Sequence, residues 1–171
     1  GAQVTLISGP VNLIAPERCN IVSVISAADM LEATMQACSD ADILIAAAAV
    51  ADYRPVTVAA QKIKKHDDAI NLELEKNPDI VSAAASEYSN LFVVGFAAET
   101  QDIESYARDK LQRKNLNAIV ANDVSRSDVG FNSDDNEAAW ITATSSKVFG
   151  KRSKTQLARD IISAIADQID D

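Results

Sequence analysis

The chain has 171 residues, of which 47% are hydrophobic, 24% charged and 5% aromatic, and its net charge is −9. A chain of this length buries roughly 70% of its unfolded surface, so we expect a single domain over residues 1–171 with an aliphatic core. The negative charge argues against a nucleic-acid partner, which requires a basic face. The longest apolar run, 43–51, is far shorter than the ~20 residues that span a bilayer, so we expect no membrane segment.

Strand and helix signals alternate from the amino terminus onward. Alternating β-forming residues predict strands over 2–8 and 21–25. Ser26 is typical of a helix N-cap, and the apolar residues after it recur at helical spacing, which predicts a helix over 27–39. The run 43–51 suits a central parallel strand that is buried on both faces, and it ends in the turn-like sequence DYRP.

The same alternation continues to the carboxyl terminus. Pro78 marks a helix start, and Asp102 is a candidate helix cap. The expected elements are strands over 70–75, 91–96 and 118–121, helices near 80–87, 103–114 and 154–169, and a hairpin with arms 138–142 and 147–149. We expect inward faces made by Ile103, Tyr106, Ala107 and Leu111 on one helix and by Leu157, Ile161, Ile162, Ile165 and Ile169 on the last. This order predicts an α/β fold: a Rossmann-like, mostly parallel sheet with helices on both faces, plus a small antiparallel strand pair.

The cysteines and the amino-terminal sequence suggest where the protein is located and what precedes Gly1. Cys19 and Cys38 lack the close spacing of metal ligands, and no secretory signal is visible. We therefore expect a cytoplasmic protein with reduced thiols. Gly1 stands directly before a strand. A glycine is common at the point where a chain leaves a helix for its next strand, so we expect at least one βα unit ahead of Gly1.

The first candidate site follows the apolar run 43–51. Ligands of open α/β sheets bind beyond the carboxyl ends of the strands, where Asp52 and then Lys62, Lys64 and Lys65 follow. Clustered lysines in an otherwise acidic chain suggest a phosphate site, although a solvated basic loop is the commoner use of such a cluster. Asp52 could receive a ribose hydroxyl, a substrate amide or a hydrated magnesium ion, or could simply form the turn.

Lys110 and Lys114 form the second candidate site. At positions i and i+4 they project from one helix face. Lysines near a helix C-terminus also complement the helix dipole without binding anything. Together with the first cluster, however, they could grip the opposite side of one polyphosphate.

Other signals are weaker. The sequence NPDI (77–80) is either a helix start or a turn whose backbone groups read the edge of a base. His66 is the single histidine and lies in a polar stretch, so we give it no role. The absence of GxGxxG in this sequence disfavours a dinucleotide-dependent dehydrogenase.

Six ordered motifs resemble one enzyme family. AAVADYRP, KIKK, EKNPDI, VVGFAAET, RKNLNAIVANDV and GFNSDDN occur in the order found in bacterial phosphopantothenate–cysteine ligase, also called phosphopantothenoylcysteine synthetase. The bacterial form is commonly the carboxyl-terminal half of a bifunctional flavoprotein whose other half is a decarboxylase. FMN would belong to that half, of which nothing is recognisable here.

The resemblance implies a reaction in two steps within coenzyme A biosynthesis. The carboxylate of 4′-phosphopantothenate attacks the α-phosphate of CTP, with Mg²⁺ present, to give an acyl-cytidylate and pyrophosphate. The amine of L-cysteine then displaces CMP. The resemblance also implies a homodimer with a protruding strand pair at the interface.

The matched motifs also imply site residues. Lys62 would be the catalytic cation that stabilises charge at the α-phosphate. Ala48 and Ala49 would line the phosphopantothenate cleft. The CTP site would comprise Ala46, Asp52, Lys62, Pro78, Asp79, Ile80, Val81, Phe96, Lys110 and Lys114.

One departure from the family limits this expectation. The family carries a strand and a loop similar to ISNxSSG ahead of the position of Gly1, and its asparagine serves the second step. We therefore expect the 171 residues to retain much of the CTP site but to lose part of the transfer to cysteine. The alternative from a different class is a non-catalytic nucleotide-binding dimerisation module.

Overall fold

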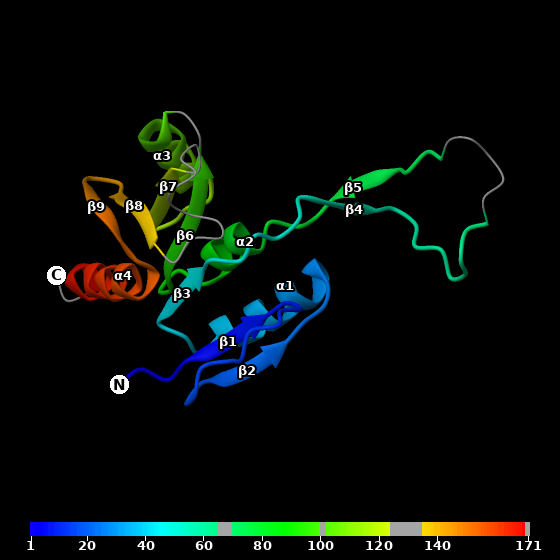
Figure 1. Ribbon diagram of the computed structural model, residues 1–171, viewed down its shortest axis with the longest axis horizontal. Coiled ribbons are helices and arrows are strands. Elements are labelled where there is room, and N and C mark those ends of the chain that lie inside the picture. Colours follow the sequence, from blue (N-terminus) through cyan, green and yellow to red (C-terminus); the bar gives the residue numbers. More distant parts are fainter. Residues whose placement is uncertain (65–69, 100–101, 124–134, 170–171) are drawn as a thin grey trace. The chain divides into compact units, whose positions relative to one another are not determined.

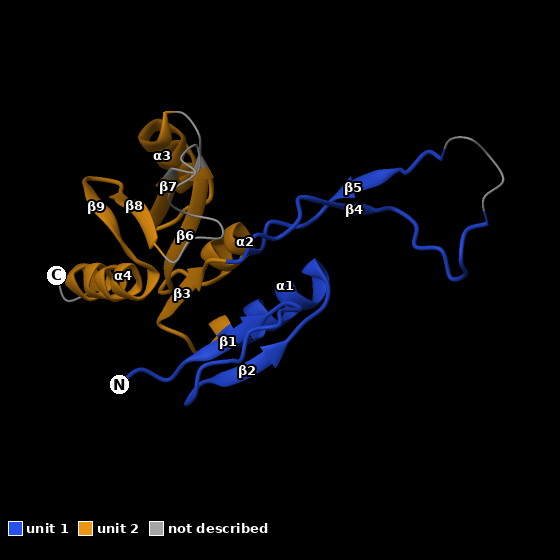
Figure 2. Ribbon diagram, in the orientation of Figure 1, with its two compact units in different colours: residues 1–37, 48–80 blue, residues 38–47, 81–171 orange. Residues whose placement is uncertain are grey.

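The computed structural model describes residues 1–64, 70–99, 102–123 and 135–169. The chain divides into two compact units, residues 1–37 with 48–80 and residues 38–47 with 81–171 (Figure 2). The expectation of one domain over 1–171, and of a further βα unit ahead of Gly1, stays a prediction. No helix in the described ranges is long and apolar enough to cross a membrane.

The first unit contains a parallel strand pair, a helix and a hairpin (Figure 1). Strand β1 (Thr5–Ser8) pairs in parallel with β2 (Asn20–Ser23), and helix α1 spans Ala27–Cys38. The hairpin strands β4 (Tyr53–Pro55) and β5 (Leu74–Lys76) are antiparallel, which confirms the small antiparallel pair. The predicted strand 70–75 is shorter and begins later, and β4 lies where we expected only a turn.

Helix α1 begins with a reciprocal cap, as Ser26 predicted. The backbone N–H of Asp29 donates to Ser26 Oγ at 3.1 Å, and the Asp29 carboxylate accepts from the backbone N–H of Ser26 at 2.9 Å. This arrangement is a capping box, which satisfies donors that the first helical turn leaves without partners. Hydrogen bonds from Ser26 and Ile25 lower the pKa of the Asp29 carboxyl below its ordinary value.

The second unit is built on a mixed sheet in the order β3-β6-β7-β8-β9, counted over the described residues. Its strands are β3 (Ile43–Ala46), β6 (Phe92–Glu99), β7 (Ala118–Asp123), β8 (Asp135–Thr142) and β9 (Ser146–Ser153), and its helices are α2 (Ile80–Glu87), α3 (Ile103–Arg113) and α4 (Lys154–Ile169). β3, β6 and β7 run parallel, β8 pairs antiparallel with β7, and β9 pairs antiparallel with β8. The predicted α/β class is thus confirmed, and the predicted ranges of α2 and α4 match.

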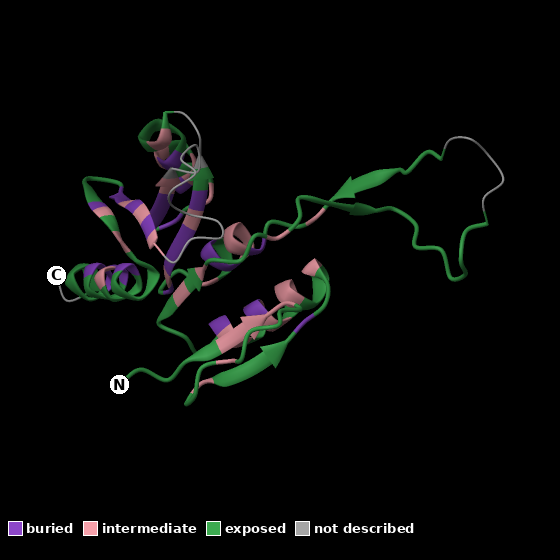
Figure 3. Cartoon of the chain, viewed as in Figure 1, coloured by how far each residue is buried: buried purple, intermediate pink, exposed green. Residues whose placement is uncertain are grey.

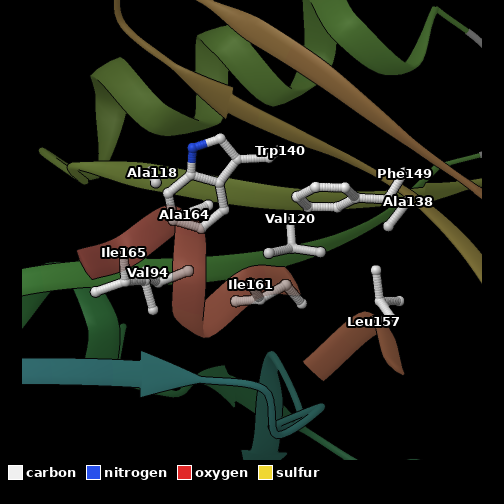
Figure 4. Close-up of a cluster of buried hydrophobic side chains, with 10 residues drawn as sticks. All are labelled: Val94, Ala118, Val120, Ala138, Trp140, Phe149, Leu157, Ile161, Ala164 and Ile165. Atoms are coloured by element: carbon white, nitrogen blue, oxygen red, sulfur yellow. The ribbon is translucent and has the colours of Figure 1, made fainter. Parts of the chain in front are cut away.

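Side chains from opposite faces of this sheet enter different layers. On one face, Trp140 and Val120 pack with Ile161 and Ile165 of α4 (Figure 4). The complete cluster is Val94, Ala118, Val120, Ala138, Trp140, Phe149, Leu157, Ile161, Ala164 and Ile165. The other face carries the fully buried Val93, Ile119 and Ile141, because successive strand residues point to opposite sides.

Gly95 of β6 lets the chain just beyond α3 approach the sheet. A Cβ at this position would lie 2.8 Å from Leu116 Cδ1, a contact that real Cβ atoms do not make. Leu116 is itself buried. Glycine at position 95 therefore leaves the space that the Leu116 side chain occupies, and a larger residue there would displace that side chain.

Several sequence expectations were wrong in detail. Within the described residues β3 hydrogen-bonds to β6 alone and stands at the end of this unit's sheet, where we expected a central strand. Asp102 adopts left-handed backbone angles and makes no capping bond through its side chain. Tyr106, Ile162 and Ile169 were expected inside but are exposed. Helix α4 carries both buried and exposed residues (Figure 3).

The ion pair between Arg152 and Asp160 joins β9 to α4. Hydrogen bonds, first from Arg152 and then from Gln156, lower the pKa of the Asp160 carboxyl below its ordinary value of 3.8. A lowered folded-state pKa means that this pair stabilises the fold above pH 3.8 and that the stabilisation is lost as the pH falls through the folded pKa.

We therefore expect Asp160→Asn to unfold at a lower urea concentration than the parent at about pH 7 and at the same concentration once the carboxyl is protonated. Asp167→Asn removes the same charge from the exposed face of the same helix and is the matched control. If the urea midpoints of the parent and Asp160→Asn differed as much at low pH as at about pH 7, the charge of Asp160 would not be the source of the stabilisation.

Candidate functional site

The candidate residues of the first unit gather where the hairpin closes. The backbone N–H of Asn77 donates to the carbonyl oxygen of Asp52 at 2.8 Å, and the Asn77 side-chain N–H donates to the carbonyl oxygen of Ala51, also at 2.8 Å. Pro78 and Asp79 follow directly and are exposed. The structure therefore brings the segment of Asp52 together with the NPDI turn, although they are far apart in sequence.

Charged side chains extend this closure along the hairpin. Arg54 donates from Nη1 to Asn77 Oδ1 at 3.1 Å and from Nε to Glu75 Oε1 at 2.8 Å. Arg54 and Glu75 are also register partners across β4 and β5. The sequence interpretation missed both residues. Their opposite charges were visible, but a cross-strand pair cannot be recognised where one strand is interpreted as a turn.

The remaining candidates of this unit lie in irregular segments. Ala48 and Ala49 follow the end of β3 and are exposed. Lys62 and Lys64 are exposed in the segment between β4 and β5. Lys65 and His66 lie outside the described residues.

The candidates of the second unit lie on β3, β6, α2 and α3. Lys110 Nζ donates to the carbonyl oxygen of Phe96 at 3.1 Å, so the lysine side chain of α3 reaches the carboxyl-terminal half of β6. The Phe96 side chain packs against the cluster beneath α4. Ala46 is the register partner of Gly95, next to Phe96. These three predicted residues are therefore neighbours.

Lys114 and Val81 complete the candidates of the second unit, and Ile80 is the last residue of the first. Lys114 is the C-cap residue of α3, and its backbone N–H donates to the carbonyl oxygen of Lys110 at 3.0 Å. Ile80 is buried and begins α2, and Val81 is half-buried beside it. Lys62 and the Lys110/Lys114 pair belong to different units, so their convergence on one triphosphate stays a prediction.

Further polar groups of the second unit hold α3 or face the sheet edge. Arg108 donates to the carbonyl oxygen of Thr142 at 3.0 Å and pairs with Glu104 at 2.8 Å, which ties α3 to the turn between β8 and β9. The hydrogen bond from Arg108 is the main cause of a lowered pKa at Glu104. At the carboxyl end of β7, Asn122 Oδ1 is buried and has no hydrogen-bond partner among the described residues, at the edge where such sheets bind ligands.

No group of three or more His, Cys, Asp or Glu side chains in the described ranges could hold a metal ion. Asp52 and Asp79 are the carboxylates among the predicted site residues of the hairpin closure.

The fold is that of an α/β protein in which Lys110 of α3 reaches the carboxyl-terminal half of the parallel strand β6. The family model of the DNA/pantothenate metabolism flavoprotein C-terminal domain matches residues 1–169. The chain belongs to this family, which confirms the resemblance found in the sequence.

The similar proteins compared below carry the same name. The chain is 47% identical over 169 residues to the coenzyme A biosynthesis bifunctional protein CoaBC of Haemophilus influenzae, covering 98% of this chain and 42% of the relative. It is 43% identical over 175 residues to CoaBC of Escherichia coli, covering 100% of this chain and 43% of the relative. The chain thus spans about two fifths of the length of the curated relatives that it matches.

Solved structures give the same fold. The crystal structure of the C-terminal domain of CoaBC matches with a TM-score of 0.83 at 35% identity, over 99% of this chain and 76% of that one. A Cab2 mutant solved in complex with phosphopantothenate-cysteine matches with a TM-score of 0.67 over 90% of this chain and 55% of that one. At 13% identity the latter likeness concerns the fold alone.

Proposed function

We propose that this chain is a ligase domain of coenzyme A biosynthesis that joins 4′-phosphopantothenate to L-cysteine at the expense of CTP. The observation that carries the proposal is the family match over residues 1–169. Relatives at 43% and 47% identity carry the name of a coenzyme A biosynthesis protein. A neighbour of the same fold, 13% identical, was solved with phosphopantothenate-cysteine, so this fold is compatible with a ligand of that kind.

The proposed chemistry needs fixed positive charge more than proton transfer. In the first step a carboxylate oxygen of phosphopantothenate bonds to the α-phosphorus of CTP, and the bond to the bridging oxygen breaks with its electrons leaving on pyrophosphate. In the second step the cysteine nitrogen bonds to the acyl carbon, CMP leaves and the nitrogen loses a proton. Negative charge gathers on phosphoryl oxygens in the first step, where preorganised cations lower the barrier most.

Each candidate residue has a part in this proposal. Lys62 would stabilise the α-phosphoryl oxygens, and Lys110 and Lys114 would hold the β- and γ-phosphates. The turn from Pro78 to Val81, with Phe96 and Ala46, would receive the base and ribose. Ala48 and Ala49 have small side chains, so they would leave room for phosphopantothenate. Mg²⁺ would neutralise the phosphates when bound with CTP.

The exposed apolar side chains of the hairpin support a homodimer. Val58, Ile63, Ile70 and Leu72 are 83%, 60%, 70% and 64% exposed. Large exposed apolar patches mark association surfaces. We include the homodimer in the proposal, and the sedimentation coefficient of the natural protein tests it.

The test of function is pyrophosphate release by the full natural protein supplied with CTP, Mg²⁺ and phosphopantothenate. Without cysteine we expect a burst that stops when the acyl-cytidylate fills the site, and with cysteine we expect continuous turnover. A protein that is stabilised by CTP but releases no pyrophosphate would instead be a nucleotide-binding module. Thermal shift with CTP and with a dinucleotide separates both from a dehydrogenase, which the dinucleotide would stabilise and CTP would not. A ligand at 100 times its dissociation constant adds about 2.7 kcal/mol of stability, so the difference is measurable.

Lys110→Ala is expected to weaken CTP binding roughly 10-fold, because it removes a charged hydrogen-bond donor beside Phe96. Lys114→Ala should act in the same direction. Titration with CTP measures both, and Arg113→Ala removes an exposed charge from the same helix as the matched control. Unchanged affinity in both lysine variants would exclude their side chains from the nucleotide site.

A further inference from the structure

Asn77 joins segments that are otherwise separate in the sequence. The β4–β5 ladder ends at the pair of Tyr53 and Lys76. Beyond it, the Asn77 backbone N–H binds the carbonyl oxygen of Asp52, and its side chain reaches one residue further to Ala51. The half-buried Asn77 therefore holds the irregular segment of Ala51 and Asp52, just ahead of β4, against the turn that begins at Pro78.

Arg54 fixes which way the Asn77 amide faces. A guanidinium only donates hydrogen bonds, so its 3.1 Å contact requires the amide oxygen, and the amide nitrogen must then face the Ala51 carbonyl. Without Arg54 the amide could rotate and set its oxygen against the Ala51 carbonyl oxygen. Arg54 is in turn held by Glu75 at 2.8 Å.

Asn77 directly precedes Pro78, so the orientation of the Asn77 side chain affects the backbone of the turn. Pro78 has a fixed φ, and the residue before a proline is confined to extended backbone angles. Few torsions therefore remain between the Asn77 amide and the backbone groups of the turn. A side chain that fixes Asn77 also fixes where those groups point.

We propose that Asn77, oriented by Arg54, is a positioning residue of the nucleotide site: it sets the turn from Pro78 to Val81 relative to Asp52. This inference rests on the proposed function, because the turn and Asp52 are taken as nucleotide-binding. The Arg54–Glu75 pair is exposed at both side chains (43% and 46%), and exposed pairs contribute little to stability. Its effect is therefore expected in nucleotide affinity more than in folding.

The test measures KM for CTP, kcat and the urea midpoint in the full natural protein. Asn77→Ala keeps the backbone bond to Asp52 and removes the side-chain bonds, and we expect KM for CTP to rise roughly 10-fold with kcat changed less than about two-fold. Asn77→Asp should be at least as impaired, because a carboxylate oxygen would face the Ala51 carbonyl. Arg54→Ala should raise KM, and Arg54→Lys, which keeps a donor for Asn77 Oδ1, should restore most of the loss.

Asn90→Ala is the matched control, since Asn90 is an exposed asparagine in the turn after α2. A parental KM for CTP in Asn77→Ala, in a protein whose parent releases pyrophosphate from CTP, would overturn the positioning role and leave the proposed function standing. A fall in kcat and in the urea midpoint with KM unchanged would also overturn it, because that result is expected of a residue that only stabilises the fold. A parent that neither binds nor uses CTP would overturn both.

Discussion

Lys62→Gln is expected to slow formation of the acyl-cytidylate by roughly 100- to 1,000-fold while CTP still binds. Glutamine keeps the length and a hydrogen-bond donor but carries no charge. Charge at the α-phosphoryl oxygens is greatest in the transition state, so a cation placed there affects kcat more than affinity. Lys62 is exposed in the free chain, so its ammonium is accessible to a nucleotide.

The burst of pyrophosphate in the absence of cysteine is the best measurement for this variant. It reports the first step alone, whatever happens to the transfer to cysteine. Lys154→Gln, at the start of α4, removes an equal charge elsewhere on this acidic chain and controls for a general weakening of CTP attraction. A Lys62→Gln burst as fast as the parental one would remove Lys62 from the catalytic role.

The sequence predicted elements best where local signals agreed. The range of α2 follows from Pro78 at its start, and that of α4 from apolar residues at helical spacing. β4 was missed because its side chains are exposed on a strand of Tyr53–Pro55, which has no hydrophobic alternation to detect. The edge position of β3 was missed because an apolar run such as ILIA is typical of a buried strand, and nothing local tells which strand is its neighbour.

The candidate site was predictable in its residue types and less so in its contacts. Clustered lysines, Asp52 and the NPDI turn could be selected from their places after strands. The bond from Lys110 to the Phe96 carbonyl and the bonds from Asn77 to Asp52 and Ala51 depend on strand register and helix position. Those are tertiary properties, fixed by packing such as that of Gly95 against Leu116.

Trp140→Ala is expected to lower the free energy of unfolding by about 3–5 kcal/mol, a large share of the roughly 5–15 kcal/mol that stabilises a domain. Trp140 is 4% exposed and stands in the cluster between the sheet and α4 (Figure 4). Removing the indole leaves a cavity among Val120, Ile161 and Ile165, which the sheet and helix could close only by moving closer together against the rest of a close-packed core. Trp140→Phe should lose less, because a ring still fills part of the space.

Urea unfolding followed by far-UV circular dichroism measures this loss, since Trp140 is the single tryptophan and its fluorescence disappears with it. Ile162→Ala is the matched control, because Ile162 lies on the same helix but is 56% exposed, and surface substitutions usually change stability by less than about 0.5 kcal/mol. Phe96 packs against the same cluster and accepts the hydrogen bond from Lys110 through its carbonyl oxygen. A loosened core should therefore also weaken CTP binding at temperatures where the variant is still folded. An unchanged unfolding midpoint would mean that α4 is not held to the sheet by this side chain.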